Sequence, residues 1–171
     1  MKKIIILIAL AVIAVNSRSQ SPVDKFFDKY SGTEGFTTVY ITKYMFDMFK
    51  DIDNGEEDKE MDEVISRLNS IKILATDDDP NTKAGIDLYD EVMKVLPRSE
   101  YKELMVIKEK DENVLFLIRE KDNKVTELLL LVGGTDEDVL ISIQGDIDMK
   151  NISKIAKAMN IEGMDKLEKI E

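Results

Sequence analysis

The chain has 171 residues, a formal net charge of −11 at pH 7, and neither histidine nor cysteine. The absence of both residue types excludes Ser-His-Asp and Cys-His nucleophile systems, His/Cys zinc sites, haem ligation through His or Cys, and disulfides. The acidic balance argues against nucleic-acid binding, because phosphate backbones are repelled by a negative surface.

The first twenty residues have the layout of a secretory signal peptide. Two lysines precede an uninterrupted apolar run over residues 4–15, and small side chains at Ser17 and Ser19 mark a cleavage site near Ser19/Gln20. A helix of that run would rise only about 18 Å, less than the roughly 30 Å hydrocarbon core of a membrane. We therefore expect residues 1–20 to be removed, leaving an exported protein, periplasmic or secreted, with no transmembrane helix in its mature form.

The mature chain, residues 21–171, is predicted to form a single α+β domain. Its length suffices for a substantial core without disulfides. The leader carries three basic residues and no acid, so its removal takes the formal net charge from −11 to −14. A surface kept soluble by like charge is the simpler interpretation, and attraction of basic partners or divalent cations is the alternative. Because no cysteine follows the leader, we expect no lipid anchor.

Helical patterns dominate the first part of the mature chain. Ser21-Pro22-Val23-Asp24 is typical of a helix start, with Ser at the N-cap and Pro at the first position. Residues 37–42 read as a strand, and Thr42 is predicted to cap a second helix. Four stripes are predicted to face the core: Val23, Phe26, Phe27 and Tyr30; Met45, Met48, Phe49 and Ile52; Met61, Val64, Ile65 and Leu68; and Ile86, Tyr89, Met93 and Leu96.

Strand patterns take over after residue 100. Turn signals separate four apolar runs spaced about ten residues apart, at 104–107, 114–118, 128–132 and 139–143. This spacing predicts an antiparallel meander, which the earlier strands at 37–42 and 71–75 are expected to join. Asp148 is predicted to cap a last main helix whose inner face is Ile152, Ile155, Ala156 and Met159. The fold class expected is thus α+β, an antiparallel β-meander sheet packed by N- and C-terminal helices.

Three acidic or glycine-rich segments resemble ligand sites only superficially. Residues 51–55 (DIDNG) invite an EF-hand interpretation, but Gly55 falls at position 5 and Asp62 at position 12, so the register fails. Residues 77–79 (DDD) are interpreted as a turn before a helix, and residues 133–138 (GGTDED) as a hairpin, since the phosphate-loop spacing is missing. Cation binding by the acidic loops stays open.

The junction after the fourth run of the meander holds a polar pair, Gln144 and Asp146, where a ligand is conceivable. Gly145 is predicted to supply a special backbone angle there. A carboxylate mechanism would require a second acid across a cleft, which the sequence does not identify. The methionines at helical spacing are interpreted as core residues. No residue is assigned a catalytic, cofactor-binding or metal-binding role, and no cofactor is expected.

Taken together, several sequence blocks resemble domain of unknown function 4252, a family of small exported bacterial proteins. The blocks are FFDKY (26–30), TVYITKYMF (38–46), IKIL (71–74), YKELM (101–105), ELLLLV (127–132) and ISIQGDID (141–148). The resemblance covers roughly residues 22–160. It implies no established activity and no catalytic residue; many relatives look like lipoproteins, whereas this chain lacks the lipobox cysteine.

The leading functional hypothesis is a non-catalytic exported protein of the bacterial envelope that binds a protein or peptide partner through a sheet face or an edge strand. The alternative is a carboxylate-dependent hydrolase acting on envelope polymers, which requires two facing acids in a cleft. The missing histidine and cysteine favour binding over catalysis.

Overall fold

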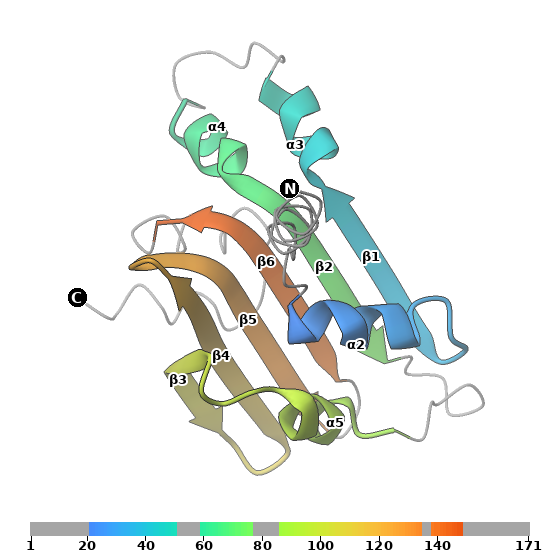
Figure 1. Ribbon diagram of the computed structural model, residues 1–171. Coiled ribbons are helices and arrows are strands. Elements are labelled where there is room, and N and C mark those ends of the chain that lie inside the picture. Colours follow the sequence, from blue (N-terminus) through green and yellow to red (C-terminus); the bar gives the residue numbers. More distant parts are fainter. Residues whose placement is uncertain (1–20, 51–58, 77–85, 135–137, 149–171) are drawn as a thin grey trace, which may run out of the picture.

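Six antiparallel strands form one sheet in the computed structural model, in the order β1-β2-β6-β5-β4-β3 (Figure 1). The structure describes residues 21–50, 59–76, 86–134 and 138–148. The strands are β1 Phe36–Thr42, β2 Leu68–Thr76, β3 Tyr101–Lys108, β4 Glu112–Lys121, β5 Lys124–Gly134 and β6 Val139–Ile147; the helices are α2 Pro22–Tyr30, α3 Lys43–Lys50, α4 Lys59–Ser66 and α5 Leu88–Val95.

The predicted meander is confirmed, because β3 pairs antiparallel with β4, β4 with β5, and β5 with β6. The turn between β4 and β5 is made by Asp122 and Asn123, whose φ angles of 53° and 60° suit a two-residue hairpin. Both early strands join the sheet, with β2 beside β6 and β1 at the edge. The α+β class follows from this sheet and its helices.

Helix α2 begins as the sequence predicts. The Ser21 side chain accepts a hydrogen bond from the Val23 amide at 3.3 Å, and the Ser21 amide donates to the Asp24 carboxylate at 3.0 Å, which satisfies two backbone groups at the helix start. The apolar stripe of this helix is buried as predicted.

Each face of the sheet carries one buried apolar cluster. We call the face beneath α2 and α5 the α2 face and the opposite one the α3 face; in Figure 1, α2 and α5 cross in front of the sheet. The α2 face cluster joins Val23, Phe26, Phe27, Tyr30, Leu88, Val92 and Leu96 of the helical segments to Leu74, Tyr101, Leu115, Leu117, Leu129, Leu131 and Leu140 of the strands. The α3 face cluster contains Phe46 and Val64 with Leu68, Ile71, Val114, Phe116, Ile118, Val125, Leu128, Leu130, Ile141, Ile143 and Ile147.

The predicted inner face of the second helix is wrong for two of its four residues: Met45 and Met48 are exposed, whereas Phe46, which was not predicted, is buried. The Phe49 side chain and Ile52 lie outside the described residues. Helix α3 follows β1 without a loop and, with α4, projects beyond the end of the sheet, so little surface is available to cover it (Figure 1). With aromatic and methionine side chains on several sides, its periodicity could not identify which side turns inward.

Two further helical predictions need correction. Helix α4 ends at Ser66, and Leu68 begins β2 instead of continuing the helical stripe. In α5 the fully buried residues are Leu88 and Val92, which were not predicted. Of the predicted stripe, Leu96 is buried at the C-cap, whereas Ile86, Tyr89 and Met93 are only partly buried at the border of the cluster. The predicted stripe with Tyr89 and Met93 is adjacent to the buried stripe with Leu88 and Val92. The packing of α5 against β5 and β6 determines which of the two stripes is buried.

Several predictions lie outside the described residues: the acidic segments at 51–55 and 77–79, the side chain of Met61, and the last helix with its packing against the sheet. Among the helices that the structure describes, none combines the length and the apolar character needed to cross a membrane.

Candidate functional site

A polar row crosses the α2 face near the N-terminus of α2. The strand register places Tyr101 beside Arg119, Arg119 beside Glu127, and Glu127 beside Gln144. Glu127, in the middle of this row, is 0% exposed. A carboxylate removed from water is costly unless it is paired and hydrogen-bonded, so its partners decide what the row does.

Three hydroxyl groups donate to the Glu127 carboxylate. Ser21 Oγ lies 2.9 Å and Tyr101 Oη 2.8 Å from Oε2, and Ser142 Oγ lies 2.8 Å from Oε1. Ser21 comes from the N-cap of α2, whereas the other two come from β3 and β6. The carboxylate therefore fastens the start of α2 to the sheet.

Two cations and a second carboxylate complete the network. Arg119 Nε lies 3.1 Å from Glu127 Oε2 as an ion pair, and Lys72 Nζ lies 2.7 Å from Asp24 Oδ1. Gln144 Nε2 joins the two pairs by donating to Asp24 at 3.0 Å and to Glu127 at 3.3 Å. The two negative charges are thus matched by two positive charges, as burial requires.

The network is a closed structural element. Burial raises the pKa of the Tyr101 hydroxyl, and the negative charge of Glu127 raises it further, so Tyr101 holds its proton as a donor. Glu127 exposes no surface within this network. Ser21, Tyr101 and Glu127 therefore position the start of α2 on the sheet.

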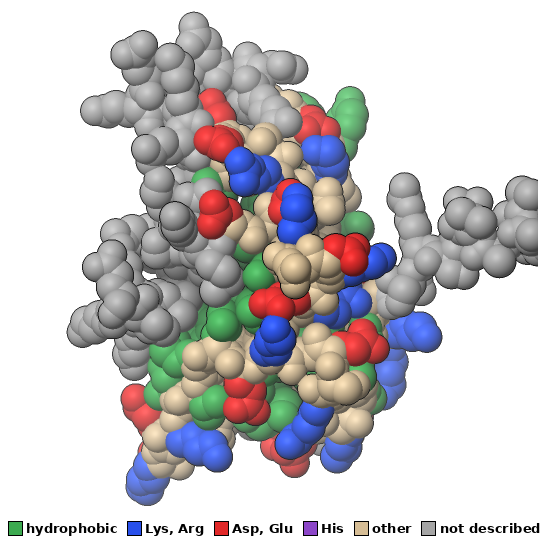
Figure 2. Space-filling view, turned by 60° about the vertical axis from the view of Figure 1, so that its left-hand side comes forward, with side chains coloured by type: hydrophobic (Ala, Val, Ile, Leu, Met, Phe, Trp, Pro, Cys, Tyr) green, Lys and Arg blue, Asp and Glu red, His purple; other side chains and the backbone are tan. Residues whose placement is uncertain are grey.

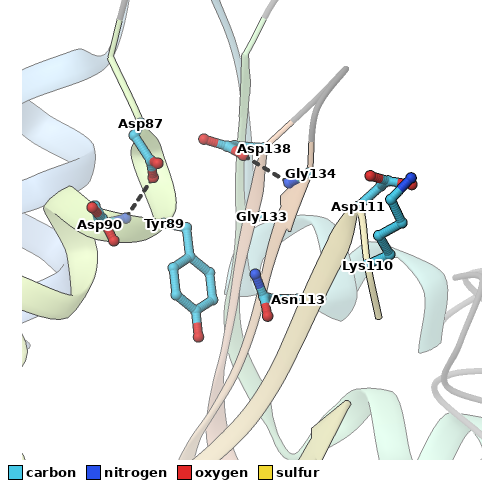
Figure 3. Close-up of a pocket in the computed structure, with 9 residues that line it drawn as sticks. All are labelled: Asp87, Tyr89, Asp90, Lys110, Asp111, Asn113, Gly133, Gly134 and Asp138. Carbon is cyan, nitrogen blue, oxygen red and sulfur yellow. Dashed lines mark hydrogen bonds between the residues drawn. The ribbon is translucent and has the colours of Figure 1, made fainter. Parts of the chain in front are cut away.

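The described residues also line a pocket at the end of the sheet where α5 begins (Figure 3). Its volume is about 300 Å³, and its lining includes four aspartates: Asp87, Asp90, Asp111 and Asp138. Asp87 accepts the Asp90 amide at 2.7 Å, and Asp138 accepts the Leu88 amide at 2.7 Å. Two of the four carboxylates are therefore occupied in holding the first turn of α5.

Tyr89 forms one wall of this pocket and points away from Asp138, toward Asn113 (Figure 3). Burial raises the pKa of the Tyr89 hydroxyl, and the charge of Asp90 adds to the effect. A Cβ atom at Gly133 would lie 2.7 Å from the Tyr89 Cβ, so only glycine allows the helix to approach the strand this closely. Within the part of the chain that the structure describes, no group of three ligating side chains is placed to hold a metal ion.

The predicted polar pair, Gln144 and Asp146, is not a joint site. Gln144 belongs to the buried network, whereas Asp146 is exposed and binds Lys124 Nζ at 2.7 Å. That hydrogen bond, more than any other interaction, lowers the pKa of the Asp146 carboxyl. The sequence reasoning missed Glu127, although a single acid that leads a run of four leucines within a strand is the signal that could have identified it.

Gly145 is required for a reason other than the predicted backbone angle. A Cβ atom there would lie 2.9 Å from the Leu68 Cα and against the Arg67 carbonyl oxygen, so the backbones of β6 and β2 touch at this point. We expect Gly145→Ala to lower the free energy of unfolding by about 1–3 kcal/mol, because the backbone must shift to admit the methyl group. Urea unfolding followed by circular dichroism measures this, with Asp146→Ala as a neighbouring exposed control. An unchanged midpoint for Gly145→Ala would contradict the close approach.

Exposed apolar side chains gather at the β1 edge of the sheet. Of the seven large hydrophobic side chains that are exposed in the described residues, five lie in β1 and α3: Val39, Tyr40, Tyr44, Met45 and Met48. We call these five residues the β1/α3 surface. The side of the molecule shown in Figure 2 intersperses acidic and basic side chains with hydrophobic ones.

The two edge strands of the sheet differ in their protection. Strand β1 has seven residues without charge, proline or glycine, and its register with β2 runs unbroken. Strand β3, at the other edge, has three charged residues and a register shift between Glu103 and Met105. Charges and bulges are the means by which natural sheets keep their edges from pairing with other chains. Only β1 lacks them among these two edges.

Comparison with known proteins gives one match. A family model described as Domain of unknown function (DUF4252) matches residues 30–155, which is more than half of the chain. No curated protein and no solved structure matches the chain.

Proposed function

The chain belongs to the DUF4252 family, and we propose that it is an exported, non-catalytic interaction protein of the bacterial envelope that holds an extended segment of a partner protein along β1. The leader-like residues 1–20 support export. The observation that carries the binding proposal is the unprotected β1 edge with its exposed apolar neighbours.

Addition of a strand to β1 would satisfy both the backbone and the side chains of this edge. An edge strand presents unpaired N–H and C=O groups, and an extended peptide that pairs with them gains main-chain hydrogen bonds. Val39 and Tyr40 lie on opposite faces of β1, because side chains alternate along a strand. Tyr44 and Met48 extend the apolar surface into α3, where methionine adapts to varied partners.

The partner segment is expected to be apolar and basic. Strand β1 itself has no charge, so it favours apolar side chains opposite it. The sequence that follows α3, residues 51–60, holds six acids and one lysine, and the whole chain carries a net charge of −11. Opposite charge on a partner steers its approach and fixes its register.

The hydrolase alternative stays a prediction. In the pocket where α5 begins, Asp90 and Asp111 are the two lining aspartates that could serve as its facing acids, since Asp87 and Asp138 hold backbone amides. If these two carboxylates catalysed hydrolysis, Asp90→Asn and Asp111→Asn would each reduce the hydrolytic activity of the protein. Binding of a partner at β1 would be unaffected by both substitutions.

A charge placed on β1 tests the proposal. We expect Val39→Lys to reduce the capture of a partner from envelope fractions about tenfold or more, because an edge lysine must be desolvated when a strand is added. Val106→Lys is the matched control: Val106 lies on β3 and is 43% exposed, against 40% for Val39. Tagged protein is crosslinked in the native envelope, and each co-purifying protein is quantified.

The pattern across the two variants decides the outcome. A protein that is lost with Val39→Lys and retained with Val106→Lys supports binding at β1. Equal retention of every co-purifying protein by both variants overturns the proposal, provided that both variants unfold at the same urea concentration as the parent.

A further inference from the structure

On the α3 face of the sheet, side chains are buried on strands that lie beyond the reach of α3 and α4. The strand register places Phe116, Leu130 and Ile141 in one row across β4, β5 and β6. These side chains are 0%, 3% and 6% exposed. Some part of the molecule must therefore cover this row.

The described helices on this face do not lie over β4, β5 and β6, where the buried row is found. Helix α3 packs on β1 and β2, and the described side chains of α3 and α4 add Phe46 and Val64 to the buried cluster, with Ile65 packed against it. Strand β4 is three strand spacings from β2, about 14 Å away. Helices α2 and α5 belong to the cluster on the opposite face. Among the described residues, no helix other than α3 and α4 contributes to the cluster around Phe116.

We infer that the C-terminal segment, residues 149–171, lies across the α3 face as an intramolecular ligand of β4, β5 and β6. The segment follows directly after Asp148, at the end of β6, which is a central strand of the sheet. Its 23 residues would extend about 34 Å as a helix, enough to cross six strands spaced about 4.8 Å apart.

The side chains of this segment match the face chemically. Ile152, Ile155, Ala156 and Met159 recur at the spacing of one helical stripe, whereas Lys154 falls on the other side. The row that they would meet is made of apolar side chains only. The leader, residues 1–20, is the other long apolar segment, but it is expected to be removed in the mature protein.

Single tryptophans in the full chain test this inference, since the chain has no tryptophan of its own. Met159→Trp should give blue-shifted emission and about threefold less quenching by acrylamide than Lys154→Trp, because a tryptophan against the sheet is shielded from water. Equal quenching of the two variants, at the level of free tryptophan, would overturn the inference. Both variants change one side chain outside the sheet, and urea midpoints check that both are folded.

A photocrosslinker then identifies the surface that is covered. Ala156→Cys is the only thiol in its variant, because the chain has no cysteine. Labelled with benzophenone, it should crosslink within the same chain to β4, β5 or β6. Crosslinks to residues 1–20, or crosslinks between two copies that increase with protein concentration, would assign the face to another occupant and overturn the inference. The test does not involve β1, so it can fail while the proposed function stands.

Discussion

Replacing Glu127 by alanine is expected to lower the free energy of unfolding by about 3–5 kcal/mol, the cost of removing one partner from a buried charge pair. The substitution leaves Arg119 without its carboxylate and deprives the hydroxyls of Ser21, Tyr101 and Ser142 of their acceptor. Each buried donor that is left unpaired adds a desolvation penalty. Urea unfolding of purified variants, followed by circular dichroism, measures the loss.

Two further variants separate the buried charge from ordinary effects of substitution. Glu127→Gln keeps the shape of the side chain and is expected to lose less stability than Glu127→Ala, which keeps the prediction testable if the alanine variant does not fold. Glu120→Ala removes an exposed acid that pairs with Lys102 on the edge strand, and its effect should stay within about 1 kcal/mol. Equal losses for Glu127→Ala and Glu120→Ala would contradict the role given to the network.

Alkaline pH is expected to destabilise the protein through Tyr101. Its pKa is raised in the folded state, above the value near 10 of an unfolded chain. Below pH 10 both states keep the proton, so the stability is fully present. Above pH 10 the unfolded chain releases its proton first, and the free energy of unfolding falls by up to about 1.4 kcal/mol per pH unit until the folded pKa is reached.

Tyr101→Phe checks this prediction. The variant loses a hydrogen bond to a charged group and should be less stable at pH 7 by about 1.5–3 kcal/mol. Its stability should then fall less steeply than that of the parent between pH 10 and pH 12. Tyr44→Phe, at an exposed position, controls for the change of residue type and should match the parent at pH 7. Parallel pH profiles for Tyr101→Phe and the parent would contradict the raised pKa.

The sequence predicted those parts of the fold that rest on local patterns. The capping box at Ser21 and the stripe of α2 satisfy rules that span one or two turns, and the meander follows from runs separated by turn residues such as Asp122 and Asn123. These features do not depend on what packs against them. The family resemblance, which rests on the same blocks, is confirmed by the match over residues 30–155.

The remaining features depend on contacts that are distant in sequence. Ser21 and Glu127 are separated by 106 residues, and only the strand order brings them together. The helical spacing of Met48 predicts a core position, but α3 extends past the sheet and leaves this side chain exposed. Gly145 was assigned a backbone angle, whereas the actual constraint is the approach of β2. The spacing of apolar residues shows which side chains share one face of a helix or strand, but it does not show what that face packs against.

The β1/α3 surface is tested most directly by site-specific crosslinking in the native envelope. Val39→Cys and Val106→Cys each introduce the only thiol of the chain, at equally exposed positions on the two edges of the sheet. Each variant carries a benzophenone label, and crosslinked peptides are identified by mass spectrometry. We expect position 39 to crosslink to one defined, apolar and basic segment of a partner protein, and position 106 not to do so. The same crosslinks from both positions, or none from position 39, would contradict this expectation.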